Sequence, residues 1–273
     1  MSDTYYFGHL VEQFEFRQNK TPAKYAWITV ERNEGQVFKT QVEQMVGFCT
    51  DEIDIIVVDG ASNDGSVNAE HLRSIGVKCL LISHANEGFS RDLQIGLIYA
   101  LRNGYSGVIT VDGNGKDSCE RIDGFINSLN LGYDYVQGSR FIAGGGHMNT
   151  PILRLLAIKL LAAPSASFFS RHKITDPTNG FRGYSRKLLT NDYLGLGENI
   201  FQGYNLVSFV PVVAGRKNLL IKEIPVLRSY PRHGTVPTKI VTYRQWVQIL
   251  LDLFRSGFGM FRRFPKETME LLF

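Results

Sequence analysis

Carboxylate and amide side chains gather in two short, glycine-containing segments of this 273-residue chain. The first is Asp59-Gly-Ala-Ser-Asn-Asp-Gly65 and the second is Asp112-Gly-Asn-Gly-Lys-Asp117, while Asn33, Glu34 and Asn86 add similar groups elsewhere. Oxygen atoms of this kind bind ribose hydroxyls and hard divalent cations that bridge phosphates. Asp and Asn also form turns and cap helices, and for Asn63 and Asp64 we keep both readings open.

The segments that must position these residues alternate between apolar runs and polar, helix-like stretches. Buried-strand patterns cover residues 25–30, 54–58, 77–82 and 107–111, and helices are predicted over 34–48, 67–75 and 89–102. This alternation predicts an open α/β sheet with right-handed crossovers. Because ligands bind at the carboxyl ends of strands in such sheets, we expect the polar segments to share one edge and one ligand.

The second half of the chain is less regular. It predicts strands over 133–140 and 218–226, an apolar helix over 151–163, a loop over 176–182 and a short helix over 185–190. From Tyr243 a helix has an apolar side, and Arg262, Arg263 and Lys266 follow it among phenylalanines. Such a tail is typical of a helix in a membrane interface, and packing on the domain or on a partner subunit fits it equally.

The C-terminal fifth of the chain is basic, and the rest is acidic. Between Arg216 and Lys266 there are eleven Lys or Arg and two acids, while the rest has 19 basic and 24 acidic residues, a net of −5. A basic C-terminal fifth indicates an anionic partner, namely nucleic acid, anionic lipid or a phosphorylated substrate, unless it is a solvated basic face. Nucleic acid is disfavoured, because a basic tail does not explain the acidic strand ends.

Composition places the chain among ordinary globular proteins, with 44% hydrophobic and 21% charged residues. Three scattered cysteines (Cys49, Cys79 and Cys119) indicate a reducing compartment. Residues 1–20 lack an apolar signal core, and no uninterrupted apolar stretch approaches the roughly 20 residues of a conventional transmembrane helix. We therefore expect a cytoplasmic protein, peripheral on the cytoplasmic membrane face.

Seven motifs in order resemble glycosyltransferase family 2, the inverting enzymes with the GT-A fold, and within it the dolichol-phosphate mannosyltransferase and polyprenyl-phosphate glycosyltransferase branch. They span residues 27–240. The motifs are Asn33-Glu34, Asp59 to Gly65, Asn86-Glu-Gly88, Thr110-Val-Asp112-Gly-Asn114, Gln137-Gly-Ser-Arg140, Asp176-Pro-Thr-Asn-Gly-Phe-Arg182 and Tyr230-Pro-Arg232-His-Gly234. The resemblance implies a mostly parallel central sheet flanked by helices. It divides the chain into an N-terminal extension (1–24), a glycosyltransferase domain (25–240) and a C-terminal amphipathic tail (241–273).

The resemblance also implies roles for single residues. The nucleotide-sugar would be bound by Asn33, Glu34, Asp59, Asn86, Asp112, Asn114, Lys116, Arg232 and Lys239. The acceptor would be bound by Arg140, Arg154, Asn179 and Arg182, and the catalytic residues would be Asp112, Asp176 and Arg140. Guanidinium groups bind phosphate bidentately, which independently supports arginine in these places.

Two departures from the family pattern bear on the metal. Gly60 stands where a second aspartate is usual, and the usual Asp-x-Asp is here Asp112-Gly-Asn114, followed by Lys116. Asn114 keeps an oxygen ligand but removes a negative charge, and Lys116 adds a positive one. We expect Mg²⁺ or Mn²⁺ bound by Asp112, Asn114 and Asp117, either with weakened affinity or with Asp117 as the replacement carboxylate.

The reaction implied is a single in-line displacement that moves a sugar from a nucleotide-diphosphate-sugar donor to a lipid-phosphate or lipid-linked saccharide acceptor, as in surface polysaccharide biosynthesis. A phosphate acceptor is already anionic and needs no strong base, whereas a hydroxyl acceptor would need one, for which Asp176 is the candidate. The partners also include a membrane contacted by the tail, with a homo-oligomer left open.

Three other functions were weighed. A sugar nucleotidyltransferase shares the acidic strand ends but usually has a glycine-rich loop after the first strand, where this chain has Glu31-Arg-Asn-Glu-Gly35. A non-catalytic, degenerate transferase that binds nucleotide-sugars would explain Gly60 and Asn114. A dinucleotide oxidoreductase is disfavoured because no G-x-G-x-x-G follows a strand.

Overall fold

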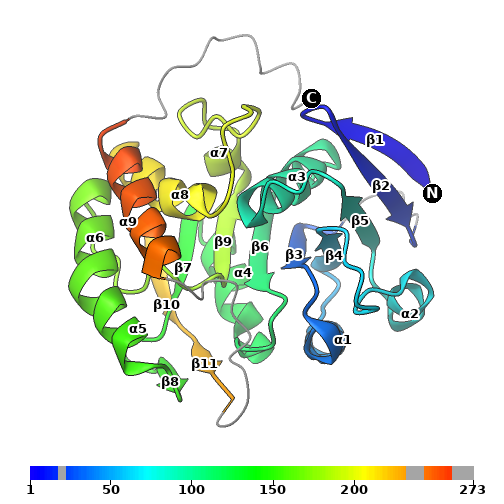
Figure 1. Cartoon of the computed structure of the whole chain (residues 1–273), viewed down its shortest axis with the longest axis horizontal. Coiled ribbons are helices and arrows are strands. Elements are labelled where there is room, and N and C mark those ends of the chain that lie inside the picture. The colour runs from blue at the N-terminus through cyan, green and yellow to red at the C-terminus, as the bar shows by residue number, and fades with distance from the viewer. Residues whose placement is uncertain (18–22, 232–242, 260–273) are drawn as a thin grey trace.

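A nine-stranded sheet forms the centre of the computed structural model, which describes residues 1–17, 23–231 and 243–259 (Figure 1). The strand order is β1-β2-β5-β4-β3-β6-β9-β7-β10. The strands are β1 (Ser2–Tyr6), β2 (His9–Glu15), β3 (Tyr25–Glu31), β4 (Ile53–Asp59), β5 (Cys79–Ser83), β6 (Gly107–Asp112), β7 (Tyr135–Ser139), β9 (Arg182–Ser185) and β10 (Ile221–Pro225).

Most strands of this sheet run in one direction. β3 is parallel to β4 and β6, β4 is parallel to β5, and β7 is parallel to β10. β2 and β9 are antiparallel to both of their neighbours. Seven of the nine strands therefore point the same way, which confirms the mostly parallel sheet predicted from the sequence.

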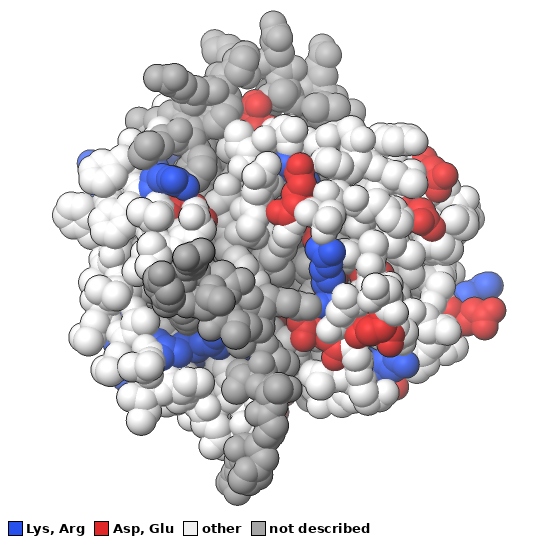
Figure 2. Space-filling view, in the orientation of Figure 1, with Lys and Arg blue, Asp and Glu red and all other residues white. Residues whose placement is uncertain are grey.

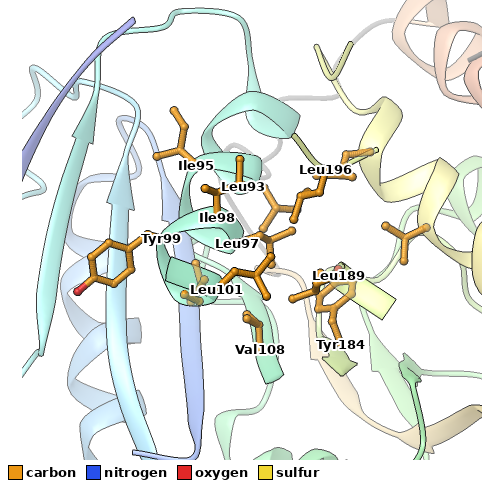
Figure 3. Packing of buried hydrophobic residues seen from close by; sticks show 14 of the residues in the cluster. Leu93, Ile95, Leu97, Ile98, Tyr99, Leu101, Val108, Tyr184, Leu189 and Leu196 are labelled. Carbon is orange, nitrogen blue, oxygen red and sulfur yellow. The ribbon is translucent and has the colours of Figure 1, made fainter. Parts of the chain in front are cut away.

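Helices cover both faces of the sheet, as expected where parallel strands are joined by crossovers. One face holds α1 (Gly35–Gly47), α2 (Ala69–Ile75), η1 (Cys119–Arg121) and α4 (Ile122–Asn130), and the other holds α3 (Phe89–Arg102), α7 (Arg186–Leu189) and α8 (Asn205–Arg216). Each face of the sheet has its own hydrophobic core, and alternate residues of β3 point into one or the other. Ile28 packs toward α3, and Trp27 packs toward α1 and α4. Figure 3 shows Leu97 and Leu101 of α3 facing Leu189 and Leu196.

A second group of elements lies beside the β7–β10 end of the sheet. β8 (Gly146–Met148) pairs in parallel with β11 (Leu227–Ser229). α5 (Ile152–Ala157), the π turn η2 (Ile158–Ala162) and α6 (Ala163–Ser170) follow one another without a break, and α9 (Tyr243–Gly257) packs against α6 and α8. Within the described residues, Ile152–Ser170 is the one helix long and apolar enough to cross a membrane by length and composition.

Most of the predicted elements are confirmed, and α3 has the predicted bounds Phe89–Arg102. The helix expected over 151–163 continues to Ser170. The sequence prediction missed α4, α8 and β9, and it missed the hairpin β1–β2, which adds residues of the expected N-terminal extension to the main sheet. Of the tail expected over 241–273, residues 243–259 lie within the described part of the chain, and α9 accounts for most of them.

Candidate functional site

A cavity of about 340 Å³ opens at the edge where the parallel strands end. Glu31 ends β3 and Asp112 ends β6, while Arg182 begins the antiparallel β9 and so reaches the same edge. Arg140 directly follows β7. Because the sheet order here is β3-β6-β9-β7, the cavity passes from carboxylates on one side to guanidinium groups on the other.

The acidic side is organised around the hydroxyl of Ser62. This hydroxyl donates to Glu31 at 2.7 Å or to Asp59 at 2.5 Å, and the backbone N–H of Ser62 donates to Asp59 Oδ1 at 3.0 Å. Ser66 and the backbone N–H of Glu34 also donate to Glu31. Burial raises the pKa of Glu31 and of Asp59 above their ordinary values. These two neighbouring strand ends therefore form a hydrogen-bonded acidic wall.

Arg228 links the two aspartates of the Asp112-to-Asp117 segment. Its Nη2 donates to Asp112 Oδ2 at 2.9 Å, and its Nη1 donates to Asp117 Oδ2. The second oxygen of Asp117 accepts from Asn179 Nδ2 at 3.1 Å. Burial alone would raise the pKa of Asp112, but the charges of Arg228 and Lys116 outweigh it and hold that pKa below its ordinary value. Asp112 is therefore ionised, and both oxygens of Asp117 are already engaged.

Asp112 and Asn114 together fit a divalent cation. Both line the cavity, and Asn114 Oδ1 is buried without a hydrogen-bond partner. Gly180 lies directly against the carboxylate of Asp112, where any side chain would overlap it. No group of three His, Cys, Asp or Glu side chains among the described residues could hold a metal. Two protein oxygens suit an ion such as Mg²⁺, which takes its other ligands from water and substrate phosphates.

A cluster of cations surrounds the ring of Tyr230. Lys116 Nζ lies 5.3 Å from the ring centre, the Arg154 guanidinium 5.5 Å and the Arg228 guanidinium 6.0 Å. Arg154 Nη1 also donates to the Tyr230 hydroxyl at 3.2 Å. Burial and the repulsion of Arg228 lower the pKa of Lys116 to about 8. So much positive charge in one wall favours an anionic ligand.

Arg140 is held in place by Asp176. Its Nε donates to Asp176 Oδ2 at 2.6 Å and its Nη2 donates to Oδ1 at 2.8 Å, with both side chains almost fully buried. Arg140 Nη1 is buried and makes no hydrogen bond. Arg140 lines the cavity, whereas Asp176 does not. The ion pair therefore fixes the orientation of the Arg140 guanidinium, which faces the cavity, while the Asp176 carboxylate lies outside the cavity lining.

The structure brings seven of the residues singled out from the sequence into the cavity lining: Glu34, Asp112, Asn114, Lys116, Arg140, Arg154 and Arg182. Six lie outside the lining: Asn33, Asp59, Asn86, Asp117, Asp176 and Asn179. Asn33 and Asn86 have left-handed backbone conformations, with φ of 54° and 52°. Asn33 accepts from the backbone of Asn63, and Asn86 accepts from Arg32. Arg232 and Lys239 lie outside the described residues.

Sequence reasoning missed several lining residues. Arg228 stands out in the sequence only as one of eleven basic residues in the C-terminal fifth, although it precedes the Tyr230 motif by two positions. Asp92, in the first turn of α3, lines the cavity with its Oδ1 unpaired, and burial raises its pKa to about 6. Phe89 and Tyr204 also line the cavity, and their rings stack with 5.7 Å between the ring centres. The available signal for Asp92 was its place as the one acidic residue of α3, in the first turn of the helix.

Comparisons with known proteins give matches of two kinds. The chain is 30% identical over 141 residues to a polyprenol monophosphomannose synthase of Mycolicibacterium smegmatis. That match covers 50% of this chain and 53% of the relative, so the chain spans about half the length of the curated relative it matches. No family model matches the chain.

Solved structures match over a larger share of the chain. A glucosyl-3-phosphoglycerate synthase of Mycobacterium tuberculosis, in complex with Mn²⁺, UDP-glucose and phosphoglyceric acid, has a TM-score of 0.62 at 14% identity and covers 86% of this chain and 80% of its own. A mannosyltransferase of Pyrobaculum calidifontis with GDP-Man and Mn²⁺ has a TM-score of 0.52 at 14% identity over 90% of this chain and 66% of its own. TarS of S. aureus in complex with UDP-GlcNAc has a TM-score of 0.53 at 12% identity and covers 91% of this chain and 78% of its own.

These matches define the class of the protein by its fold. The chain has the α/β architecture of the GT-A glycosyltransferases, which confirms the predicted fold class. The curated relative that the chain matches over half its length is a polyprenol monophosphomannose synthase, which agrees with the polyprenyl-phosphate branch named by the resemblance.

Proposed function

We propose that this protein is an inverting glycosyltransferase that moves a sugar from a nucleotide-diphosphate-sugar to a polyprenyl phosphate or another lipid-linked acceptor. The observation that carries the proposal is the cavity that joins Asp112 and Asn114 to the cations around Tyr230. Such a cavity suits two phosphate-bearing substrates at once, one bound through a metal ion and one bound through guanidinium groups.

The donor's diphosphate would bind between Asp112, Asn114 and Lys116. Asp112 and Asn114 would hold the Mg²⁺ or Mn²⁺ ion, which offsets charge on the departing diphosphate when it is bound. Lys116 Nζ and the Arg228 guanidinium add positive charge on the same side. The nucleoside would extend toward the acidic wall formed by Glu31, where carboxylates suit ribose hydroxyls.

The acceptor phosphate would bind at Arg140 and Arg154. Arg140 offers its unpaired Nη1, and Arg154 lines the cavity at the start of the apolar helix. An acceptor oxygen attacks the anomeric carbon, the bond from that carbon to the donor's phosphate oxygen breaks, and the nucleoside diphosphate leaves with the bonding electrons. Attack opposite the leaving group inverts the configuration. These residues lower the barrier by positioning and by charge stabilisation.

The position of Asp176 supports an acceptor that needs no base. Its carboxylate is fully buried, outside the cavity lining, with both oxygens bonded to Arg140. A phosphate oxygen is already ionised, so this acceptor is compatible with a site whose base candidate is occupied. The tail's membrane contact, a cytoplasmic location and a homo-oligomer stay predictions.

The test is a direct transfer assay on the purified full chain. UDP-, GDP- and CDP-sugars are each incubated with a short polyprenyl phosphate and Mg²⁺ or Mn²⁺, and both products are measured by mass spectrometry. We expect a nucleoside diphosphate and a glycosyl-phospholipid in equal amounts. Asp112→Ala should abolish both, and Asp51→Ala, an exposed loop change far from the cavity lining, serves as the matched control.

Other outcomes of this assay identify the competing functions. A sugar nucleotidyltransferase would form neither product in this assay, but in a parallel reaction supplied with a nucleoside triphosphate and a sugar 1-phosphate it would release inorganic diphosphate. Donor binding without any turnover or hydrolysis, across all acceptors, would indicate a degenerate transferase that only binds nucleotide-sugars. Donor binding is followed independently by the rise in melting temperature that a native-state ligand produces.

A further inference from the structure

The continuous helix Ile152–Ser170 is apolar on its outer side as well as on its packed side. Its inner side contributes Ala166 and Phe169 to a small core with Val212 of α8 and Leu253 of α9. Along its outer side, Leu153 is 82% exposed, Leu160 is 67% exposed and Phe168 is 77% exposed. Single exposed leucines are common on protein surfaces, but a row along one helix requires an explanation.

The neighbouring helix α9 extends the exposed row. Its exposed apolar side chains Val247, Leu251 and Phe254, and Phe258 directly after its last residue, recur every three or four residues and so lie on one side. The ring of Phe169 contacts Phe254 at 5.3 Å and Phe258 at 5.5 Å, which joins the two helices. We call the combined surface the apolar face; it consists of Ile152, Leu153, Leu156, Leu160, Leu161, Phe168, Val247, Leu251, Phe254 and Phe258.

The charges near the apolar face are mostly positive. The chain contains no Asp or Glu between Asp134 and Asp176. Lys159, Arg171 and Lys173 are exposed on this helix or directly after it. In Figure 2 the left part of the molecule, over α5, α6 and α9, is largely white with blue patches and little red. An apolar surface with a basic border suits the interface of a bilayer that contains anionic lipid.

The apolar face adjoins the candidate site. Arg154 lines the cavity and contacts Tyr230, while Leu153, its neighbour in the same helical turn, is exposed. A phosphate at Arg154 would therefore have an apolar surface directly beside it. The helix is about 28 Å long, enough to span a bilayer, but its inner side is packed against α8 and α9. It can lie in a membrane interface but cannot cross the membrane without leaving those helices.

We propose that the apolar face docks on the surface of a bilayer containing anionic lipid, with the helix Ile152–Ser170 lying in the plane of the interface. This deepens the proposed function, because it brings the cavity mouth to the lipid headgroups where a polyprenyl phosphate resides. The apolar face includes Val247, Leu251, Phe254 and Phe258 of the tail over 241–273 that the sequence suggested as the membrane contact, and it adds the helix Ile152–Ser170 to them.

The experiment is co-sedimentation of the full chain with vesicles of phosphatidylcholine alone or with 30% phosphatidylglycerol. We expect binding to the anionic vesicles, weaker binding to the neutral ones, and a loss of affinity of at least about tenfold for Leu160→Glu, since a leucine side chain leaves the apolar phase. Leu131→Glu is the matched control, because Leu131 is 70% exposed at the end of α4 and outside the apolar face. It should bind like the unmodified chain.

Two results would overturn the proposal. One is the absence of vesicle binding by the unmodified chain. If sedimentation velocity then shows a dimer that Leu160→Glu dissociates, the apolar face binds a second copy of the chain instead of a membrane. The other is equal binding by Leu160→Glu and Leu131→Glu, which would move the contact to another part of the chain. Nucleotide-induced melting shifts, measured without lipid, check that both variants are folded and test the donor site separately. Failure of docking and failure of the proposed function are therefore distinguishable.

Discussion

Asp92 occupies the space that a side chain at position 60 would need. A Cβ atom on Gly60 would lie 2.9 Å from Asp92 Oδ2 and 3.2 Å from Arg32 Cδ. The family pattern that this chain resembles has an aspartate at position 60, next to Asp59. Asp92 reaches the same place from α3, so we infer that the carboxylate missing from the loop is supplied by the helix.

Moving the carboxylate from position 92 to position 60 tests this inference. Gly60→Asp alone should destabilise the fold by about 1–3 kcal/mol, since two carboxylates would meet in a buried space. Combining Gly60→Asp with Asp92→Ala should recover most of that loss and restore nucleotide binding, measured as the melting-temperature shift with UDP and GDP. A double variant no more stable than Gly60→Asp would show that the two positions do not share one space.

The pH dependence of stability gives a second test of Asp92. Burial raises its pKa to about 6 from the ordinary value of 3.8, so between these values the native state holds a proton that the unfolded chain releases. The free energy of unfolding should therefore fall as pH rises through this window, by up to about 3 kcal/mol. Asp92→Asn does not titrate and should lose this part of the slope in urea unfolding at pH 4 to 7. Identical slopes for the two proteins would contradict the buried carboxyl.

At the scale of elements, the close approach of α3 to the sheet depends on Gly96. A Cβ atom there would lie 2.8 Å from Val58 Cγ2 and 3.2 Å from Ile28 Cγ2. Both neighbours are fully buried strand residues with no space to move into. Gly96 therefore sets the distance between the strands that carry the acidic wall and the helix that carries Asp92 and Phe89.

We expect Gly96→Ala to destabilise the fold by about 1–3 kcal/mol, although alanine is the better helix former. Gly47→Ala is the matched control: it also lies in a helix, a Cβ there meets nothing within 4 Å, and it should be neutral or stabilising by up to about 1 kcal/mol. Urea unfolding of both variants measures the difference. If both substitutions stabilise, the packing of α3 on the sheet is looser than described.

The elements that the sequence predicted are those whose pattern is local. β3, β4 and α3 combine apolar content with clear turn or cap residues at their ends. α8, which was missed, contains Pro211, and the helix expected over 151–163 continues past Pro164, although proline lacks an N–H donor and is unusual inside a helix. The structure continues that helix past Pro164 after the π turn Ile158–Ala162. Tertiary packing thus overrode two local signals.

The strand pattern itself could place only those site residues that follow strands, whereas Arg154 and Arg182 were expected from the family resemblance. Glu34, Asp112 and Asn114 lie at strand ends, so the parallel sheet alone places them together. Arg228 reaches Asp112 because β11 pairs with β8 and forms a bridge between Asp117 and Arg228, a contact across more than a hundred residues. Nothing local in the sequence encodes such a pairing, and the same holds for the approach of Asp92 to Gly60.

At the scale of the whole molecule, the strand order places acidic side chains at one side of the cavity and basic side chains at the other. The acidic ends of β3 and β4 lie in the first half of the chain, and Arg140, Arg154 and Arg228 come from the second half. The antiparallel strand β9 lies between the two halves of the sheet and places Arg182 at the boundary. The cavity therefore has an acidic wall for the proposed nucleoside and a basic wall around Tyr230 for the phosphates of the proposed donor and acceptor.

The N-terminal hairpin belongs to this whole and is not an appendage. β2 pairs with β5, Tyr6 and Val11 are buried in the main core, and the Tyr99 hydroxyl donates to Glu15. We expect Tyr6→Ala to cost about 3 kcal/mol in unfolding free energy, because a buried aromatic ring is removed. Tyr5→Ala, one residue earlier but 68% exposed, should change it by less than about 0.5 kcal/mol. Equal effects of the two substitutions would mean that residues 1–17 fold apart from the sheet.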